Sequence, residues 1–406
     1  MEGEDSMWLF NRFPGLSVAY HRMVMKVSRS VLGIDGKKVV FCCFSGRSYG
    51  DNPRAISERL HELCPEAKIV WRLKRNALER LAGVLPDYVK PVNFNSRQSL
   101  IELATARVWV DNFSLKNYVV PVEGRQEYIQ TWHGDRAIKK ICYDLEEPGK
   151  WRVEEKCSRV VTASAFGEKM FRTAFRYKGE YIRAGSPRND ILVRNDPADT
   201  RRVREKLGVG PQVRLLLYAP TYRENESVIP KRAQMDMDRT LRCLEEATGE
   251  RWMCLFRAHY KSAGIDLEAI KGRIVDATQY DDMAELLMAA DMLLTDYSSC
   301  AFDYILRDKP ALFFIADWEE YLSTRGVYFD VREAPLMTAA NQDELETLIR
   351  GLTPERVRQN CAEIREYFGY YETGHATDAV CDYIIECLGG RDRQANGWKD
   401  SRRGKA

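Results

Sequence analysis

The chain has 406 residues, and this length exceeds what one hydrophobic core usually supports, so two domains are predicted. Hydrophobic residues make up 45% of it, yet no apolar run approaches the ~20 residues of a membrane-spanning helix. Lys and Arg total 62 against 60 Asp and Glu, and this balance excludes the strong basic field of a typical nucleic-acid-binding protein.

The N-terminus begins with the acidic run Met1 to Asp5, whereas a secretory signal begins with positive charge. We therefore expect the protein to stay in the cytoplasm. The 11 cysteines are too sparse for a disulfide scaffold and have no paired C-x-x-C spacing, so most are expected to be reduced and buried. Neither a metal nor a cofactor is predicted.

Residues 1–35 are predicted to form an amphipathic segment ahead of the first domain. Basic residues occupy some faces of the predicted helix, and apolar residues recur at helical spacing at Leu16, Tyr20, Met23, Val27 and Val31. Two interpretations stay open: the helix packs on the first domain, or it lies in a membrane surface. The second interpretation predicts a protein that is peripheral on the inner face of the cell membrane.

From about residue 36 onward, short β-rich runs alternate with amphipathic helical stretches, which indicates parallel sheets covered by helices. The predicted fold class is therefore α/β. Strands are expected at residues 39–44, 67–71, 108–110, 128–131, 160–162, 215–218, 253–256, 292–295 and 311–314.

A polar stretch at residues 189–210 separates two series of these elements and predicts the domain junction. The resulting boundaries are a first Rossmann-like domain at 36–195, a second at 196–390, and a basic tail at 391–406 that is expected to be disordered. The two domains are predicted to face each other across a cleft.

The residues that follow each strand are candidates for the site, because ligands of doubly wound sheets bind beyond the carboxyl ends of the strands. The first predicted strand runs into a loop that contains Ser45, Arg47 and Ser48. Such a loop can be an ordinary strand-to-helix turn or can contribute to a binding site.

The strand at 128–131 is followed by His133, Gly134 and Asp135, and then by a predicted helix that carries Arg136, Lys139 and Lys140. An imidazole at a strand end, beside a helix N-terminus that attracts anions, has the geometry of a general base. A lone histidine is more often structural, and the sequence leaves both roles open.

Arginines follow three later strand ends or turns. Arg188 comes just after a Gly and Pro turn, and Arg223 follows a strand with the hydroxyl of Thr221 nearby. Arg257 directly follows a strand, and alternation places His259 on the same side if that strand continues. Each arginine could bind phosphate or form a surface ion pair.

The strand at 292–295 turns through Ser298 and Ser299 into a helix that carries Asp303 in its first turns. Hydroxyls and free N–H groups at a helix start can bind a diphosphate, and simple N-capping is the alternative. The Asp303 carboxylate could accept hydrogen bonds from a polyol or a ribose. The sequence has no G-x-x-x-x-G-K-[ST] loop and no clear G-x-G-x-x-G turn, so neither a P-loop enzyme nor a dinucleotide dehydrogenase is supported.

In this order, these segments resemble the CDP-glycerol glycerophosphotransferase family over roughly residues 38–385. The resemblance is carried by Phe44–Tyr49, Thr131–Gly134, Gly185–Asp190, Tyr218–Arg223, Arg257–His259, and Thr295–Ser299 with Asp303. It implies the two-domain GT-B fold, with the acceptor on the first domain and CDP-glycerol on the second. The implied reaction is attack of an acceptor hydroxyl on the β-phosphorus of CDP-glycerol with release of CMP, in teichoic acid or related cell-surface polymer biosynthesis.

The resemblance also implies roles for the candidate residues. His133 and His259 would be catalytic, with His133 as the base for the acceptor hydroxyl. The diphosphate would be held by His259 and by three arginines, namely Arg188, Arg223 and Arg257. These residues would also stabilise charge on the transferring phosphates. Further substrate contacts are expected from Gly134, Asp135, Arg136, Thr221, Ser298, Ser299 and Asp303, with Ser45, Arg47 and Ser48 as a possible acceptor loop.

Two places depart from the family pattern. Asp135 and Arg136 stand where threonine and proline usually follow His-Gly, and Tyr260 stands where proline usually follows the second histidine. Asp135 could orient His133 or exclude a more anionic acceptor. This hypothesis predicts that Asp135→Thr changes acceptor choice more than it changes CMP release.

The expected partners are a CDP-glycerol donor and a lipid-linked glycan or polyol phosphate acceptor at the membrane surface, without nucleic acid. The alternatives are a CDP-ribitol ribitolphosphotransferase and a GT-B glycosyltransferase that uses a nucleotide sugar and releases a nucleoside diphosphate. A non-catalytic nucleotide-binding scaffold is a further alternative. The presence of both histidines and all motif arginines argues against it. The sequence leaves the oligomeric state and the number of units added open.

Overall fold

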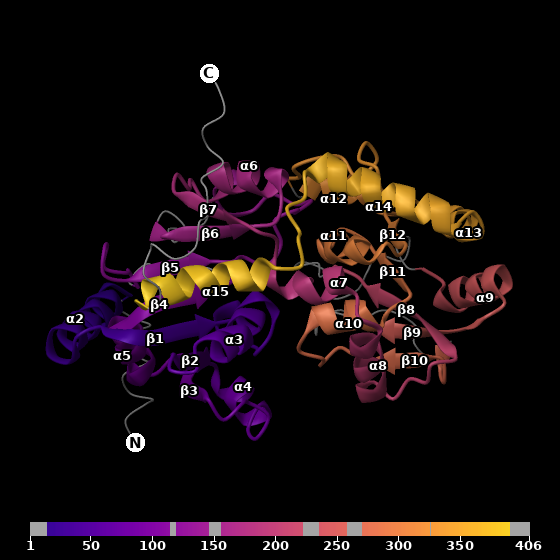
Figure 1. The fold of residues 1–406 in the computed structure, drawn as a ribbon. Helices are drawn as coiled ribbons and strands as arrows, with labels where there is room; N and C mark the ends of the chain where they lie inside the picture. Colours follow the sequence, from indigo (N-terminus) through magenta and orange to yellow (C-terminus); the bar gives the residue numbers. More distant parts are fainter. Residues whose placement is uncertain are drawn as a thin grey trace.

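The computed structural model describes residues 14–113, 119–145, 156–221, 235–257, 270–324 and 326–389. Arg223, His259, Tyr260 and the predicted tail at 391–406 lie outside these residues. The described chain forms two α/β domains side by side, each built around one sheet (Figure 1).

The first domain has a seven-stranded parallel sheet in the order β3-β2-β1-β4-β5-β6-β7. The inner half of β1 is buried on both faces, as expected for a parallel sheet covered by helices. The strands are β1 (Asp35–Cys42), β2 (Lys68–Leu73), β3 (Val89–Asn93), β4 (Ala106–Asp111), β5 (Glu127–Gln130), β6 (Arg159–Thr162) and β7 (Glu180–Arg183). The helices are α2 (Pro14–Leu32), α3 (Asp51–Leu63), α4 (Arg75–Arg80), α5 (Arg97–Thr105) and α6 (Ala165–Ala174).

The second domain has a six-stranded parallel sheet in the order β10-β9-β8-β11-β12-β13. Its strands are β8 (Val213–Ala219), β9 (Arg251–Phe256), β10 (Ile274–Asp276), β11 (Met292–Thr295), β12 (Ala311–Phe314) and β13 (Met337–Ala339). Its helices are α7 (Asp190–Arg194), α8 (Pro197–Lys206), α9 (Met237–Thr248), α10 (Met283–Ala289), α11 (Cys300–Tyr304), α12 (Trp318–Thr324), α13 (Gln342–Arg350) and α14 (Pro354–Phe368).

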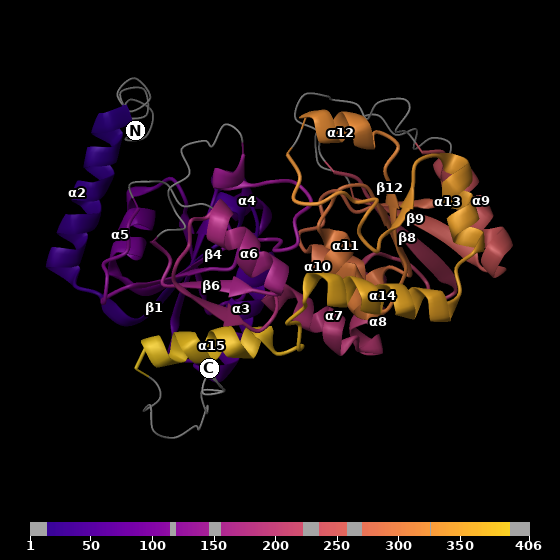
Figure 2. The same ribbon diagram turned by 90° about the horizontal axis from the view of Figure 1, so that it is seen from above.

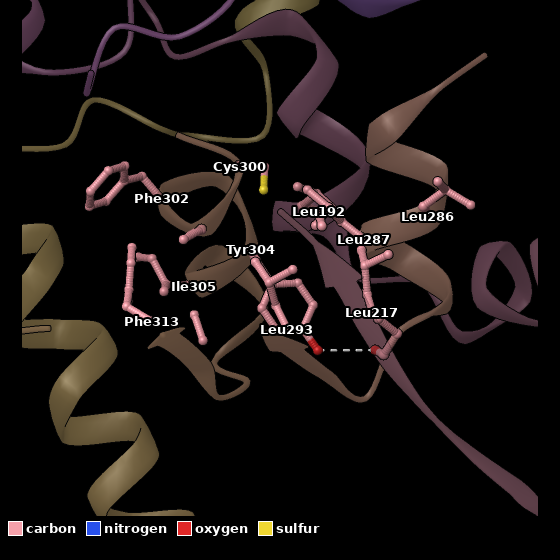
Figure 3. Packing of buried hydrophobic residues seen from close by; sticks show 14 of the residues in the cluster. Leu192, Leu217, Leu286, Leu287, Leu293, Cys300, Phe302, Tyr304, Ile305 and Phe313 are labelled. Carbon is pink, nitrogen blue, oxygen red and sulfur yellow. Dashed lines mark hydrogen bonds between the residues drawn. The ribbon is translucent and has the colours of Figure 1, made fainter. Parts of the chain in front are cut away.

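One core of the second domain lies directly beneath the helices that face the first domain. Figure 3 shows Leu217 and Leu293 from neighbouring strands packed with Leu287 of α10 and Tyr304 of α11. Leu192 of α7 belongs to the same buried cluster. The sheet and these helices therefore form one packed unit, which holds the strand ends at the cleft in fixed positions.

All nine predicted strands are present, with end shifts of a few residues. The structure adds four strands that the sequence did not indicate, namely β3, β7, β10 and β13, and they are the edge strands of the two sheets. An edge strand packs less of its surface, so its hydrophobic pattern is weaker. Both residues at the middle of β7 are only half-buried and its two ends are exposed.

The last described helix, α15 (Ala376–Cys387), returns to the first domain after α14 (Figure 2). Val380, Cys381, Ile384 and Ile385 are buried in the core beneath β1, β2 and β4. This helix falls within residues 196–390, the range predicted for the second domain. The chain therefore crosses between the domains twice, because the apolar face of α15 completes the first core.

The N-terminal helix α2 packs along α5. Val24 and Met25 are the buried apolar residues of α2, with 6% and 1% of their surface exposed. Met23, Val27 and Val31, which were predicted on the apolar face, are instead 56%, 53% and 74% exposed. None of the described helices is both long and apolar enough to span a bilayer.

Direct backbone hydrogen bonds join the two domains. Tyr328 N–H donates to Ile138 C=O and Lys140 N–H donates to Gly326 C=O, both at 2.8 Å. A further bond joins the segment after α14 to the loop after β6: Tyr371 N–H donates to Ala163 C=O, also at 2.8 Å. These bonds fix how the two sheets face each other, and hence the width of the cleft between them.

Candidate active site

A cavity of about 510 Å³ lies between the domains at the carboxyl ends of the strands. Of the predicted site residues, it brings together His133, Arg188, Thr221, Arg257, Ser298, Ser299 and Asp303. Phe44, Asp51 and Lys139 complete the first-domain wall, and Asp281 and Asp282 lie on the wall of the second domain. The strand-end rule therefore located the cavity from the sequence.

His133 is held in a defined orientation at the end of β5. Its Nδ1 lies 2.7 Å from the backbone carbonyl of Asn112, so Nδ1 must carry the proton and donate it. The lone pair of Nε2 is therefore free to accept a proton. The tautomer is that of a general base.

Aromatic rings enclose the half-buried imidazole of His133. The ring centroids of Trp132, Phe44 and Phe113 lie 4.4, 5.2 and 5.6 Å from it. Burial lowers the pKa of His133 to about 4, although the Asn112 carbonyl and the Asp51 carboxylate act to raise it. The imidazole is therefore neutral near pH 7, as a base must be.

Gly134 follows His133 and contacts the opposite domain. A Cβ atom at this position would lie 2.7 Å from the Ser299 Oγ and 3.3 Å from its Cβ, which is too close for unstrained packing. The two domains can approach here only because Gly134 has no side chain. Gly134 thus allows His133 and Ser299 to share one cavity.

We predict that Gly134→Ala lowers turnover by roughly 10-fold or more, because the added methyl group separates the base from the second-domain wall. Steady-state kinetics check this effect, with Gly83→Ala as the control, since Gly83 has open space at its Cβ position. Gly83 and Gly134 have φ values of +75° and +159°, which alanine rarely adopts, so both variants carry a backbone cost. Only Gly134→Ala adds the collision with Ser299. Equal turnover in the two variants would contradict the close approach.

Asp135 points away from the cavity and into the first domain. Its Oδ2 accepts hydrogen bonds from Ala163 N–H at 2.6 Å, from Ser164 Oγ at 3.2 Å and from Thr162 Oγ1 at 3.3 Å. Only 5% of its surface is exposed. This placement corrects the predicted substrate contact: the carboxylate fixes the loop after β6, and a selective effect of Asp135→Thr on acceptor choice is not expected.

Arg136 is also buried beneath the cavity instead of lining it. Its Nη2 lies 2.9 Å from Asp303 Oδ1 and 3.2 Å from Glu372 Oε1, and its guanidinium covers the Tyr370 ring at 4.2 Å. The predicted substrate contact is replaced by a structural one. Arg136 links the first domain to α11 and to the segment between α14 and α15.

Asp303 lines the cavity, but its oxygens are already occupied. Oδ1 accepts from Arg136 at 2.9 Å and from Asn189 Nδ2 at 2.8 Å, and Oδ2 accepts from Arg188 Nη2 at 2.9 Å and Nε at 3.2 Å. Burial acts to raise the pKa of Asp303, but the two guanidiniums hold it below its usual value. The predicted contact with a polyol is therefore not supported, because the carboxylate has no acceptor site left.

Arg188 lies between the domains at the wall of the cavity. Besides Asp303, it pairs with Asp51, whose Oδ2 lies 3.2 Å from Nη1. Two carboxylates thus hold its guanidinium in place beside His133. This position allows its charge to act on an anion in the cavity even though its hydrogen bonds are made within the protein.

The second-domain wall has the donors that an anion needs. Arg257 Nη1 donates to the carbonyls of Ala277 at 3.1 Å and Thr278 at 2.5 Å, and these bonds orient the guanidinium. Among the described residues, no carboxylate lies within ion-pair distance of it. Burial lowers its pKa. Ser298 and Ser299 line the same cavity just before α11 begins. Together they form a hydrogen-bonding surface with one guanidinium opposite His133, on a wall that also carries the carboxylates of Asp281 and Asp282.

Thr221 is fixed by the loop after β11. Both its N–H, at 2.8 Å, and its hydroxyl donate to Asp296 Oδ1. The hydroxyl is thereby used as a donor but can still accept a hydrogen bond.

Among the described residues, no cluster of three or more histidine, cysteine or acidic side chains could hold a metal ion.

The predicted acceptor loop does not line the cavity with the expected residues. Ser48 Oγ donates to Cys43 Sγ at 3.3 Å, and the Arg47 carbonyl accepts from Arg80 at 3.2 Å. The turn lies against the end of β2, where Lys74 N–H donates to Gly46 C=O at 2.6 Å; a Cβ at Gly46, whose φ is +81°, would lie 3.0 Å from the Arg72 carbonyl. Ser45, Arg47 and Ser48 are absent from the cavity wall, and Phe44 contributes instead.

Sequence reasoning missed the residues that hold the site together, above all Asn52 and Asn112. Asn112 supplies the carbonyl for His133, and its side-chain Oδ1 accepts from Phe44 N–H at 2.8 Å. It follows the strand predicted at 108–110, so the strand-end rule could have found it. Asn52 stands before Pro53, a pair typical of an ordinary helix start, so the sequence alone gives it no role in the site.

Comparison with known proteins is consistent with this geometry. A family model described as CDP-Glycerol:Poly(glycerophosphate) glycerophosphotransferase matches residues 23–386. The teichoic acid poly(glycerol phosphate) polymerase of Bacillus subtilis (strain 168) is 30% identical over 389 residues, which cover 91% of this chain and 51% of the relative. The protein of the same name from Bacillus spizizenii (strain ATCC 23059 / NRRL B-14472 / W23) is 27% identical over 392 residues, which cover 92% and 98%. The chain spans about half the length of the first relative and nearly all of the second.

A solved structure of the wall teichoic acid polymerase TagF matches with a TM-score of 0.78 and 25% identity, over 94% of this chain and 97% of that chain. The predicted GT-B arrangement of two facing parallel sheets is thereby confirmed. With a family model that spans residues 23–386, the chain belongs to the CDP-glycerol:poly(glycerophosphate) glycerophosphotransferase family.

Proposed function

We propose that this protein transfers glycerol phosphate from CDP-glycerol to a hydroxyl of a lipid-linked glycan or polyol phosphate acceptor, with release of CMP, in the synthesis of teichoic acid or a related polymer. One observation carries the proposal. The free Nε2 of a neutral His133 shares a cavity with Arg257, Ser298 and Ser299, so a base faces an anion-binding wall across the domain interface.

In the proposed reaction, the acceptor oxygen forms a bond to the β-phosphorus while His133 Nε2 takes the hydroxyl proton. The bond between that phosphorus and the CMP oxygen breaks, and the electron pair leaves with CMP. Arg257, Ser298 and Ser299 stabilise the charge on the phosphates as the bonds change. The Arg188 guanidinium adds positive charge from the first-domain side.

Two further residues keep their predicted roles in this proposal. His259 and Arg223 lie outside the described residues, and both are proposed to hold the donor diphosphate. Arg257 and Thr221, which are described, precede them closely in the chain and line the cavity. This closeness in sequence to two cavity-lining residues, together with the family resemblance, is what supports the two proposed roles.

The function is tested by the nucleotide that the purified protein releases. CDP-glycerol, CDP-ribitol and UDP-sugars are supplied in parallel with acceptor-containing membranes, and released CMP and UDP are measured. The proposal expects CMP from CDP-glycerol. CMP from CDP-ribitol alone would change the donor, UDP from a sugar nucleotide would support a glycosyltransferase, and binding without release would support a scaffold.

We also propose that α2 brings the protein to an anionic membrane surface, where a lipid-linked acceptor would lie. Met23, Val27 and Val31 follow one another at four-residue spacing on the exposed side of α2. Arg22 and Lys26 are exposed beside them. An apolar stripe flanked by basic residues is suited to the interface of anionic phospholipids.

We predict that replacing Met23, Val27 and Val31 together with serine lowers binding to anionic phospholipid vesicles by roughly 10-fold, because three apolar side chains no longer enter the lipid. Vesicle co-sedimentation measures the effect. Val84→Ser is the control, since Val84 is 69% exposed on the same domain. Unchanged vesicle binding by the triple variant, or after deletion of residues 1–35, would contradict this proposal.

A further inference from the structure

The loops that hold His133 and Arg188 meet at a single buried side chain. The loop after β5 contains Trp132 and His133, and the turn after β7 contains Arg188. Asn52, near the start of α3, lies between them with only 1% of its surface exposed. It does not line the cavity, so direct contact with substrate is not its role.

The Asn52 amide makes opposite hydrogen bonds to the two loops. Its Nδ2 donates to the Trp132 carbonyl at 3.0 Å, and its Oδ1 accepts from Arg188 N–H at 3.0 Å. A weaker contact joins Nδ2 to the Thr131 carbonyl at 3.5 Å. Only a group that donates and accepts at once can satisfy both loops, and among side chains of this size the amide of asparagine does so.

The backbone at Trp132 needs such support. Its φ is +48°, a left-handed conformation that is rare and costly for a bulky side chain. Three bonds hold the residue there: its N–H donates to Gln130 Oε1 at 2.8 Å, and its carbonyl accepts from Asn52 Nδ2 at 3.0 Å and from Thr131 Oγ1 at 3.1 Å. Because His133 follows directly, the direction of its imidazole depends on this conformation.

We propose that Asn52 is a positioning residue for the transfer reaction, which sets His133 at a fixed distance from Arg188 by bridging Trp132 C=O and Arg188 N–H. The neighbouring Asp51 adds a second connection, since its carboxylate pairs with the Arg188 guanidinium at 3.2 Å. This inference rests on the proposed function, in which His133 is the base. It assigns to the start of α3 a role in catalysis that acts through other residues.

Two variants test the bridge. Asn52→Ala removes both hydrogen bonds, and Asn52→Ser keeps a smaller polar group that cannot span the two loops. We expect kcat for CMP release to fall about 100-fold in Asn52→Ala and by a smaller factor in Asn52→Ser, because reacting groups that shift by ~1 Å lose that much rate. The control is Asn360→Ala, since the Asn360 amide also bonds a carbonyl, that of Pro335 at 2.7 Å, but far from the cavity.

A pH profile separates positioning from general damage to the fold. The charged groups that act on His133, namely Asp51, Arg188 and Lys139, are all retained in Asn52→Ala. When the loop loosens, water reaches the imidazole, so its pKa rises toward the ordinary value of about 6.5. The acid limb of the rate profile should therefore move to higher pH in Asn52→Ala and stay in place in Asn360→Ala.

A double-variant cycle gives the second readout. If Asn52 acts through His133, Asn52→Ala should cost far less in a His133→Ala background than in the native chain. The same loss in both backgrounds, with an unmoved acid limb, would overturn the inference, as would full activity of a folded Asn52→Ala. If Asn52→Ala fails to fold, Asn52→Ser gives the same comparison. A native chain that releases no CMP would refute the proposed function instead, so the two failures are distinguishable.

Discussion

His133→Ala is expected to lower the rate of CMP release from CDP-glycerol by about 100- to 10,000-fold, the range that a general base usually contributes. The reason is geometric. The Asn112 carbonyl fixes the proton on Nδ1, so Nε2 is the one basic atom that this imidazole presents to the cavity. Steady-state kinetics with purified protein and acceptor measure the loss.

The matched control is His61→Ala, because the His61 ring stacks on Tyr88 at 3.8 Å, away from the cavity. It should keep the native rate. The pH profile gives an independent check. Because the pKa of His133 is lowered to about 4 and the neutral form is the base, the rate should stay constant from about pH 8 to about pH 6 and fall only at lower pH. A fall in rate centred near pH 6.5, or a His133→Ala variant with native activity, would contradict the assignment.

Asp303→Ala is expected to lower the free energy of unfolding by about 3–5 kcal/mol, because it leaves two buried guanidiniums without their shared carboxylate. Arg136 and Arg188 are only 2% and 8% exposed. The lowered pKa of Asp303 gives the sign of the pH dependence. A group with a depressed folded-state pKa stabilises the fold above its unfolded pKa of about 3.9 and loses that contribution as the pH falls further.

Urea unfolding at neutral pH measures this loss. Asp343→Ala is the control, since Asp343 pairs with Arg239 at 2.6 Å on the surface, where its side chain is 83% exposed. A surface pair of this kind contributes about 0–1 kcal/mol. If Asp303→Ala were as stable as Asp343→Ala, the network that joins the domains would not contribute to stability.

The sequence predicted the interior of both sheets and missed their edges. The central strands β1, β4, β8 and β11 have apolar runs because helices cover both of their faces. The edge strands β3, β7, β10 and β13 have shorter apolar runs interrupted by polar residues, and such sequences resemble loops. The place of α15 was also beyond local patterns, because only the assembled first core shows which surface its apolar face covers.

The sequence singled out residues that share one cavity, but it did not predict the direction of every side chain. His133, Arg188, Arg257, Ser298 and Ser299 all line the cavity, as expected of residues at strand ends. Asp135 and Arg136 come directly after Gly134, yet the helix predicted there is absent and the chain buries both side chains. Their charges alone favoured a ligand contact, and the contacts that bury them come from residues far along the chain.

The hydrogen bonds of Asn52 could not be predicted from the sequence either. Asn52 bonds to residues about 80 and 136 positions away in sequence, at Trp132 and Arg188. No local pattern reports such partners, and an asparagine before proline is equally typical of a plain helix start. Its role is visible only where the three loops meet.

The most direct test of the account is transfer of labelled glycerol phosphate from CDP-glycerol to a lipid-linked acceptor, with released CMP measured in the same reaction. If the proposed transfer occurs, label in the acceptor and CMP in solution appear in equal amounts with the native chain, and both are lost in His133→Ala. Tight binding of CDP-glycerol without transfer, or equal transfer by native and His133→Ala proteins, would contradict it.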